Sequence, residues 1–308
     1  MTTDAYHRLF RAAMRIRLVE ERIIDLYPSD LIQSPVHLSI GQEGPSVCLC
    51  DALQASDPVF GTYRSHALYL AKGGDLAAMF RELCGRLGGP SKGKAGSMHL
   101  AAPEVGFMGS SAVVASNLPH AVGAALAAKR RGTGQVCVAA FGDGATEEGV
   151  AHESLNFAAL HALPVLFFCE NNDLAVHSRR AARQSYDLCG WAAGYGIDTV
   201  RIAESWDFVA TRATLAETIA RIRETGRPAF VEILTYRYKE HVGPGEDFGA
   251  GYRGRDEAAW WQARDPLIAD AALAAGFAPG IAAEIDAALA DALAAPLPER
   301  DDLLTDVL

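Results

Sequence analysis

Residues 135–170 read QVCVAAFGDGATEEGVAHESLNFAALHALPVLFFCE, with a short apolar run at each end and a helical pattern between them. The runs at 135–141 and 164–170 are continuous rather than alternating, as expected for strands buried on both faces. The segment 147–163 has helical periodicity. Strand, helix and strand within 36 residues form a βαβ unit, whose strands pair in parallel through a right-handed crossover.

The rest of the chain repeats this alternation and adds helices at both ends. A second unit follows, with strands expected near 199–205 and 228–238 around a helix at 206–225. Helical periodicity also covers 4–27 and 67–87, and the Ala-rich tail from about 257 to 308. No repeat or linker divides the chain. We therefore expect residues 1–308 to form a single α/β domain, a doubly wound and mostly parallel sheet with helical extensions.

Composition excludes several classes of protein. The formal charge of −10 argues against a broad nucleic-acid surface, which needs clustered Lys and Arg. The six cysteines form no CxxC pair, so buried reduced thiols are expected. No segment has the pattern of a signal peptide, and no continuous apolar run reaches the ~18 residues of a membrane span. A cytoplasmic protein without membrane contact is expected.

Polar residues follow both strands of the first unit. Gly142-Asp143-Gly144 ends the first strand, and Glu170-Asn171-Asn172-Asp173 ends the second. Taken alone, each segment is more often an ordinary turn or polar loop than a binding site. If the strands are neighbours, however, Asp143 and an asparagine face the same crevice, where parallel sheets bind ligands. Carboxylate and amide oxygens suit Mg²⁺ or Ca²⁺, and the N–H groups of Gly144 and Ala145 suit an anion.

Two other phosphate-binding motifs are excluded. The segment from Gly88 to Ala95, GGPSKGKA, has the spacing of a P-loop up to its lysine. However, Ala95 replaces the required Ser or Thr, and a helical pattern precedes the segment where a strand is needed. GDGATEEG also fails as a dinucleotide fingerprint, because its third glycine stands at the wrong offset.

Asp143 followed 29 positions later by Asn172 resembles the thiamine diphosphate motif. Nearly the whole chain is then similar to the alpha subunit of the first, decarboxylating component of 2-oxo acid dehydrogenases (pyruvate, acetoin and branched-chain types). Further matches occur in order along the chain: HLSIGQE (37–43), YRSH (63–66), GKAGSMH (93–99), VVASNLPHAVGAALA (113–127), TYRYKEH (235–241), GYR (251–253) and RDPL (264–267).

The resemblance implies a thiamine diphosphate-binding fold and a set of site residues. The Mg²⁺ ligands would be the side chains of Asp143 and Asn172 and the backbone carbonyl of Leu174. Further cofactor contacts would come from Tyr63, Arg64, Ala112, Val114, Gly144, Ala145, Arg237 and His241. Ala112 stands where the family usually has glycine, and its methyl group would slightly narrow the cofactor site at that position.

Two histidines carry the expected catalytic roles. His241 follows Arg237 by four residues, as in the family, where this histidine lies near the reacting centre. His37 resembles a substrate-contacting position. A histidine titrates near neutral pH and can position substrate or move a proton. The alternative for His241 is a loop histidine with only a structural hydrogen bond.

The resemblance also implies a partner, because the family's pyrimidine-binding domain lies on a separate beta chain, and an α2β2 assembly is expected. The enzyme would decarboxylate a 2-oxo acid and pass the acyl unit to a lipoyl group on an acyltransferase core. The sequence VGPGEDFGAGYR (242–253) departs from the family's Ser-rich text. A split carboligase or transketolase-like enzyme that uses an aldehyde or sugar acceptor therefore stays open, as does a scaffold without activity.

Overall fold

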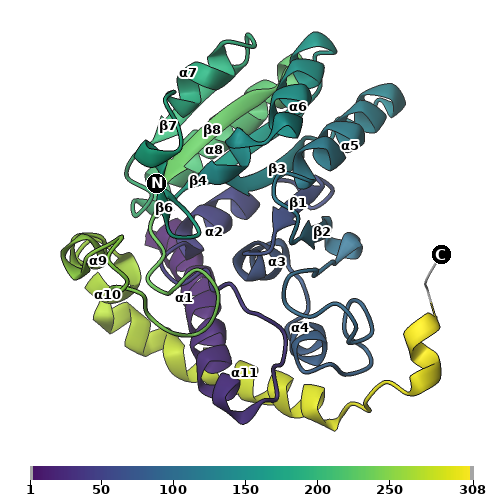
Figure 1. The fold of residues 1–308 in the computed structure, drawn as a ribbon, viewed down its shortest axis with the longest axis vertical. Helices are drawn as coiled ribbons and strands as arrows, with labels where there is room; N and C mark the ends of the chain where they lie inside the picture. Colours follow the sequence, from purple (N-terminus) through teal and green to yellow (C-terminus); the bar gives the residue numbers. More distant parts are fainter. Residues whose placement is uncertain (1–2, 306–308) are drawn as a thin grey trace.

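The computed structural model describes residues 3–305. Its main sheet has six strands in the order β2-β1-β3-β4-β8-β7, and every neighbouring pair is parallel (Figure 1). The strands are β1 Val59–Thr62, β2 Phe107–Ser111, β3 Cys137–Gly142, β4 Val165–Asn171, β7 Asp198–Ile202 and β8 Ala229–Leu234. The predicted mostly parallel sheet is confirmed. Strand β1 and the edge strand β2 were not predicted.

Helices cover both faces of this sheet, as a doubly wound fold requires. One hydrophobic core joins the sheet to α1, α2, α3, α4, α8 and α11, and the other joins it to α5, α6 and α7. Their bounds are α1 Thr3–Leu26, α2 Glu43–Ala52, α3 His66–Lys72, α4 Leu76–Leu83, α5 Asn117–Arg131, α6 Gly149–Leu160, α7 Leu188–Ala193, α8 Phe208–Thr225 and α11 Ala271–Ala294.

The central strands are apolar throughout because they serve both cores. In β4, Leu166 and Phe168 belong to one core, while Phe167 and Cys169 belong to the other. Successive side chains of a strand point to opposite faces, so a strand covered on both sides needs an apolar residue at every position. This explains why a continuous apolar run, without alternation, predicts a central strand here.

Two helix predictions need correction. The helix expected at 67–87 is two helices. Helix α3 ends at Gly73, whose φ of +102° suits glycine, and Asp75 then caps α4 by accepting the N–H of Ala78. The helix expected at 147–163 is α6, Gly149–Leu160. A separate 3₁₀ helix, η3, covers Asp143–Glu147 before it.

The C-terminal segment is helical, as predicted, but it is divided into α9 Arg255–Gln262, α10 Pro266–Ala269 and α11. Helix α11 packs across α1 and α4 (Figure 1). Its most apolar window of 18 residues has a mean hydropathy of 1.4, so by length and composition α11 could span a membrane. Of that window, 17% is buried inside the protein. The expectation that no segment reaches this length is wrong for α11, although one such helix is weak evidence of membrane insertion.

Candidate metal and diphosphate site

The two polar strand ends lie side by side. Strands β3 and β4 pair directly, with Gly142 opposite Glu170, so Asp143 and Asn172 follow adjacent carboxyl ends. The condition on which the predicted site depended is therefore met. The N–H groups of Gly144 and Ala145 belong to η3 and not to the start of the α-helix, which begins at Gly149.

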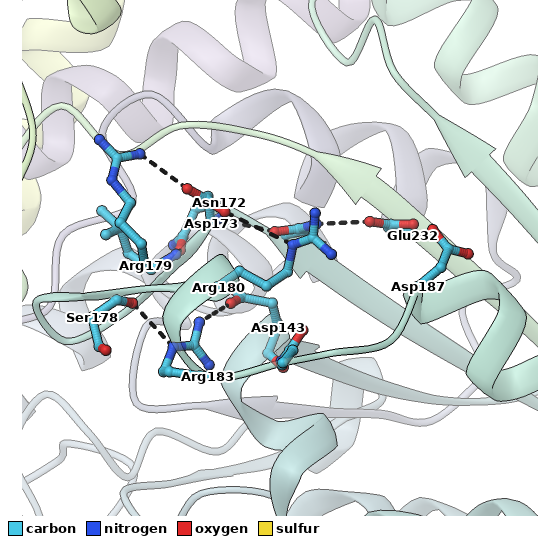
Figure 2. A network of polar contacts seen from close by, with 12 residues as sticks. Asp143, Asn172, Asp173, Ser178, Arg179, Arg180, Arg183, Asp187 and Glu232 are labelled. Carbon is cyan, nitrogen blue, oxygen red and sulfur yellow. Dashed lines mark hydrogen bonds and ion pairs between the residues drawn. The ribbon is translucent and has the colours of Figure 1, made fainter.

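Asp143 is fully buried, and its two carboxylate oxygens have different surroundings. Oδ2 accepts a hydrogen bond from Arg183 Nη2 at 2.6 Å, as Figure 2 shows. Oδ1 is also buried, and it has no hydrogen-bond partner among the residues that the structure describes. Burial raises the pKa of this carboxyl, although Arg183 opposes the shift. A buried oxygen without a partner fits a bound cation.

The second strand end forms a tight turn beside Asp143. Asn172 Oδ1 accepts the N–H of Leu174 at 3.1 Å, and Asp173 between them has a φ of +64°. Leu174 then begins a small hairpin of β5 Leu174–Ala175 and β6 Ser178–Arg179. The hairpin lies so close to Gly144 that a Cβ added there would stand 2.9 Å from Ala175 Cβ.

The donor set around this turn is chemically hard. Across residues 3–305, no group of three or more His, Cys, Asp or Glu side chains is arranged to hold a metal. The alternative to such a group is a set of three oxygen ligands: the carboxylate of Asp143, the amide oxygen of Asn172 and the backbone carbonyl of Leu174. Oxygen ligands of this kind, completed by a ligand's own phosphates and by water, suit Mg²⁺ rather than a metal that prefers nitrogen or sulfur.

A cavity of about 230 Å³ opens beside these residues. Nine of the residues predicted for the site line it: Tyr63, Arg64, Val114, Gly144, Ala145, Asn172, Leu174, Arg237 and His241. Asp143 lies buried next to the lining, His37 packs against Tyr63, and Ala112 is half-buried beside the lining residue Ser111. The tertiary structure thus gathers segments from five regions of the chain around one cavity.

Two arginines, the half-buried Arg64 and the buried Arg237, supply positive charge to the cavity wall. Arg64 donates to the carbonyl oxygens of Leu38 at 2.6 Å and His241 at 3.0 Å, neither of which carries a charge. Burial lowers its pKa to about 10, which still leaves it charged at neutral pH. Arg237 is paired with Asp247 at 3.0 Å. The charge on Arg64 therefore makes this wall attractive to an anion.

His37, Tyr63 and His241 form an aromatic cluster at one side of the cavity. The ring centroid of His37 lies 4.4 Å from that of Tyr63 and 5.1 Å from that of His241. Burial, with Arg64 nearby, lowers the pKa of His37 to about 3 and that of His241 to about 4. Both rings are consequently neutral at physiological pH. The structure brings together the two histidines predicted to be catalytic, and Tyr63 packs against both rings.

Several cavity residues were not predicted. Gln42 lines the cavity and accepts from Asn172 Nδ2 at 3.4 Å, and Glu170 lines it with a pKa that burial raises to about 8. Gln42 stands in the motif HLSIGQE and Glu170 in the strand end Glu170-Asn171-Asn172-Asp173. Their place in these two motifs was the signal by which the sequence could have indicated them. The others are Thr62, Ser111, Ala115, Gly142, Glu147, Glu148, Ala175 and Val176.

The exclusion of a P-loop at 88–95 has a structural explanation. The Gly-rich loop does wrap backbone N–H groups around an anion, but the anion is the buried carboxylate of Glu82. That carboxylate accepts from the N–H groups of Ser91, Gly93, Ala95 and Gly96 at 2.8–3.1 Å. The cradle is occupied by the protein's own side chain, so this loop is not a phosphate site.

Comparisons with known proteins agree with this geometry. Residues 11–273 match the family model described as dehydrogenase E1 component. The alpha subunit of acetoin:2,6-dichlorophenolindophenol oxidoreductase from Cupriavidus necator is 37% identical over 97% of this chain and 92% of its own length. The pyruvate dehydrogenase E1 component subunit alpha from Rhizobium meliloti is 37% identical over 81% of this chain and 71% of its own length.

A solved structure extends the agreement to the fold. Transketolase from Campylobacter jejuni superposes with a TM-score of 0.58 at 15% identity, over 89% of this chain and 48% of the transketolase chain. At that identity the likeness concerns the fold alone. The family match covers most of the chain, and the curated relatives exceed 30% identity over most of their length. The chain therefore belongs to the dehydrogenase E1 component family.

Proposed function

We propose that this chain is the alpha subunit of a two-chain enzyme that uses thiamine diphosphate and Mg²⁺ to decarboxylate a 2-oxo acid. The acyl unit is then passed to a lipoyl acceptor. The observation that carries the proposal is the buried Oδ1 of Asp143, which has no hydrogen-bond partner within residues 3–305. It lies beside the Asn172 turn, at the edge of a cavity that Arg64 lines. A hard cation and an anionic ligand are both needed to complete that arrangement.

The chain's residues divide the work of holding the cofactor. Asp143, Asn172 and the carbonyl of Leu174 would bind Mg²⁺, and the N–H groups of Gly144 and Ala145 would donate to the diphosphate. When bound, thiamine diphosphate supplies the electron sink for decarboxylation. The protein contributes position and electrostatics, because Asp143 is fixed by burial and by Arg183 before any ligand arrives.

The neutral histidines define what this chain adds to the chemistry. A neutral imidazole can accept a proton or donate one, whereas an imidazolium can only donate. His37 Nδ1 is buried and has no hydrogen-bond partner among the described residues, so it is free to bind a substrate oxygen. We assign His37 and His241 to positioning the substrate and moving a proton at its oxygen atoms.

The mouth of the cavity supports a partner subunit. Four valines at or next to the lining are exposed: Val113, Val114, Val176 and Val242, by 68, 43, 47 and 44%. Exposed aliphatic side chains gathered around a functional cavity are typical of a protein interface. We propose that a beta subunit covers them and completes the site, in agreement with the relatives that are named as alpha subunits. An α2β2 assembly and docking on an acyltransferase core extend this proposal.

The transketolase-like alternative has less support. The transketolase match concerns the fold alone, whereas the curated relatives named above are alpha subunits of acetoin and pyruvate enzymes. The segment 242–253 departs from the Ser-rich family text, and its Asp247 pairs with both Arg237 and Arg253. These ion pairs tie the segment that follows His241 to the cavity residue Arg237.

The test is co-expression of the chain with its candidate beta subunit. The purified pair is supplied with thiamine diphosphate, Mg²⁺ and a panel of 2-oxo acids or acetoin, and CO₂ release and acyl transfer to a lipoyl domain are measured. We expect decarboxylation of at least one 2-oxo acid and transfer to the lipoyl domain. Transfer only to aldehyde or sugar acceptors would instead establish the carboligase alternative.

A further inference from the structure

Arg183 and Gln184 lie over the turn that carries Asp143, and we call them the Arg183–Gln184 clamp. Arg183 donates through Nη2 to Asp143 Oδ2 at 2.6 Å and through Nε to the carbonyl of Ser178 at 3.1 Å (Figure 2). Its Nη1 donates to Glu147. Gln184 Nε2 donates to the backbone carbonyl of Asp143 at 3.0 Å. The clamp therefore fixes both the backbone and the carboxylate of one residue.

The clamp makes the two carboxylate oxygens of Asp143 unequal. Arg183 occupies Oδ2, and its side chain is only 11% exposed, so the ion pair is shielded from water. Oδ1 stays buried without a partner among the described residues. A cation that approaches the site consequently finds one free oxygen on this carboxylate instead of two.

The number of free oxygens matters for the choice of cation. Mg²⁺ demands a nearly octahedral shell of six ligands and takes a carboxylate through one oxygen. Ca²⁺ is larger, accepts six to eight oxygens, and commonly binds both oxygens of one carboxylate. The planar fork of Arg183 spans Asp143 and Glu147, so freeing Oδ2 would break contacts on two carboxylates.

We infer that Arg183 is a positioning residue that selects Mg²⁺ over Ca²⁺, by holding Oδ2 of Asp143 so that only Oδ1 can coordinate the ion. The inference rests on the proposed function, since it concerns the same metal site. It goes beyond that function by giving a role to a residue outside the ligand set, on the segment that follows the β5–β6 hairpin.

The experiment measures cation preference directly, without turnover. The chain is purified with its beta subunit, and binding of Mg²⁺ and of Ca²⁺ in the presence of thiamine diphosphate is followed by titration calorimetry. The variants are Arg183→Gln and, as a second form that keeps the charge but lacks the planar fork, Arg183→Lys. The matched control is Arg180→Gln, because Arg180 lies on the same segment and pairs loosely with Asp173 at 3.8 Å.

We expect the wild-type pair and the Arg180→Gln control to prefer Mg²⁺ to the same degree. In both Arg183 variants the ratio of the Ca²⁺ to the Mg²⁺ dissociation constant should fall by about tenfold, the size of one charge-assisted hydrogen bond. Thermal unfolding establishes that each variant is folded. A wild-type ratio in a folded Arg183 variant overturns the inference alone, whereas absence of cation-dependent cofactor binding in the wild type overturns the proposed function.

Discussion

Replacing Asp143 by asparagine should separate cofactor binding from folding. The carboxylate is fully buried and Oδ1 has no hydrogen-bond partner among the described residues, an arrangement that costs about 1–3 kcal/mol in the folded protein. Asparagine removes that charge while its carbonyl oxygen still accepts from Arg183, which also keeps its pair with Glu147. Relief of the buried charge stabilises the folded protein, and the weaker contact with Arg183 destabilises it. Because these two effects oppose each other, the free energy of unfolding should change by no more than about 1 kcal/mol.

Binding should respond very differently to the same substitution. The cation loses its one charged protein ligand, a loss of at least about 3 kcal/mol, which weakens Mg²⁺-dependent binding of thiamine diphosphate about 150-fold. Titration calorimetry of the two-chain enzyme measures the binding. Urea unfolding of the chain, followed through its four tryptophans, measures the stability.

The neighbouring Asp173→Asn serves as the control. Asp173 has a φ of +64°, which asparagine tolerates, and its side chain is 43% exposed. This control should leave both the binding and the stability near wild type. If Asp143→Asn destabilised the fold by about 3 kcal/mol yet bound cofactor normally, Asp143 would be a structural turn residue and the reasoning would be wrong.

Three further outcomes are expected. Glu82→Ala should lower the free energy of unfolding by about 4 kcal/mol in urea titrations, since four part-buried N–H groups lose their acceptor at about 1 kcal/mol each. A change below about 1 kcal/mol would contradict this. Gly144→Ala should weaken cofactor binding in calorimetry, because its Cβ would stand 2.9 Å from a hairpin side chain, whereas Gly149→Ala, whose Cβ meets nothing within 4 Å, should not. Finally, the pKa values of His37 and His241 fall from 6.5 to about 3 and about 4 in the folded protein, so the unfolded chain binds more protons below pH 6.5. The free energy of unfolding should then decrease as pH falls from 6.5 toward 4, and a double His→Asn variant should show a flatter dependence in the same pH series.

The two polar strand ends of the candidate site were predictable because each one is local. An apolar run that ends in Gly142-Asp143-Gly144, and a second that ends in Asn172, specify strand ends by burial alone, and parallel pairing places such ends at one edge. Strands β1 and β2 were not predicted, since they are short and β2 reads FMGSS, without an apolar run. The break between α3 and α4 was also missed, because the helical periodicity continues on both sides of the short Gly73-Gly74 turn.

The sequence by itself determined the parallel sheet, the oxygen-bearing side chains at its carboxyl edge and the family. Only the tertiary structure decided which groups surround those side chains. Arg183 reaches Asp143 across 40 residues, and Arg64 reaches the carbonyl of His241 across 177. Periodicity reports only whether a residue faces the core, and so it contains no information about partners that distant in the chain. The unequal oxygens of Asp143 and the neutral histidines arise from burial beside specific charges, which exists only after the whole chain has packed.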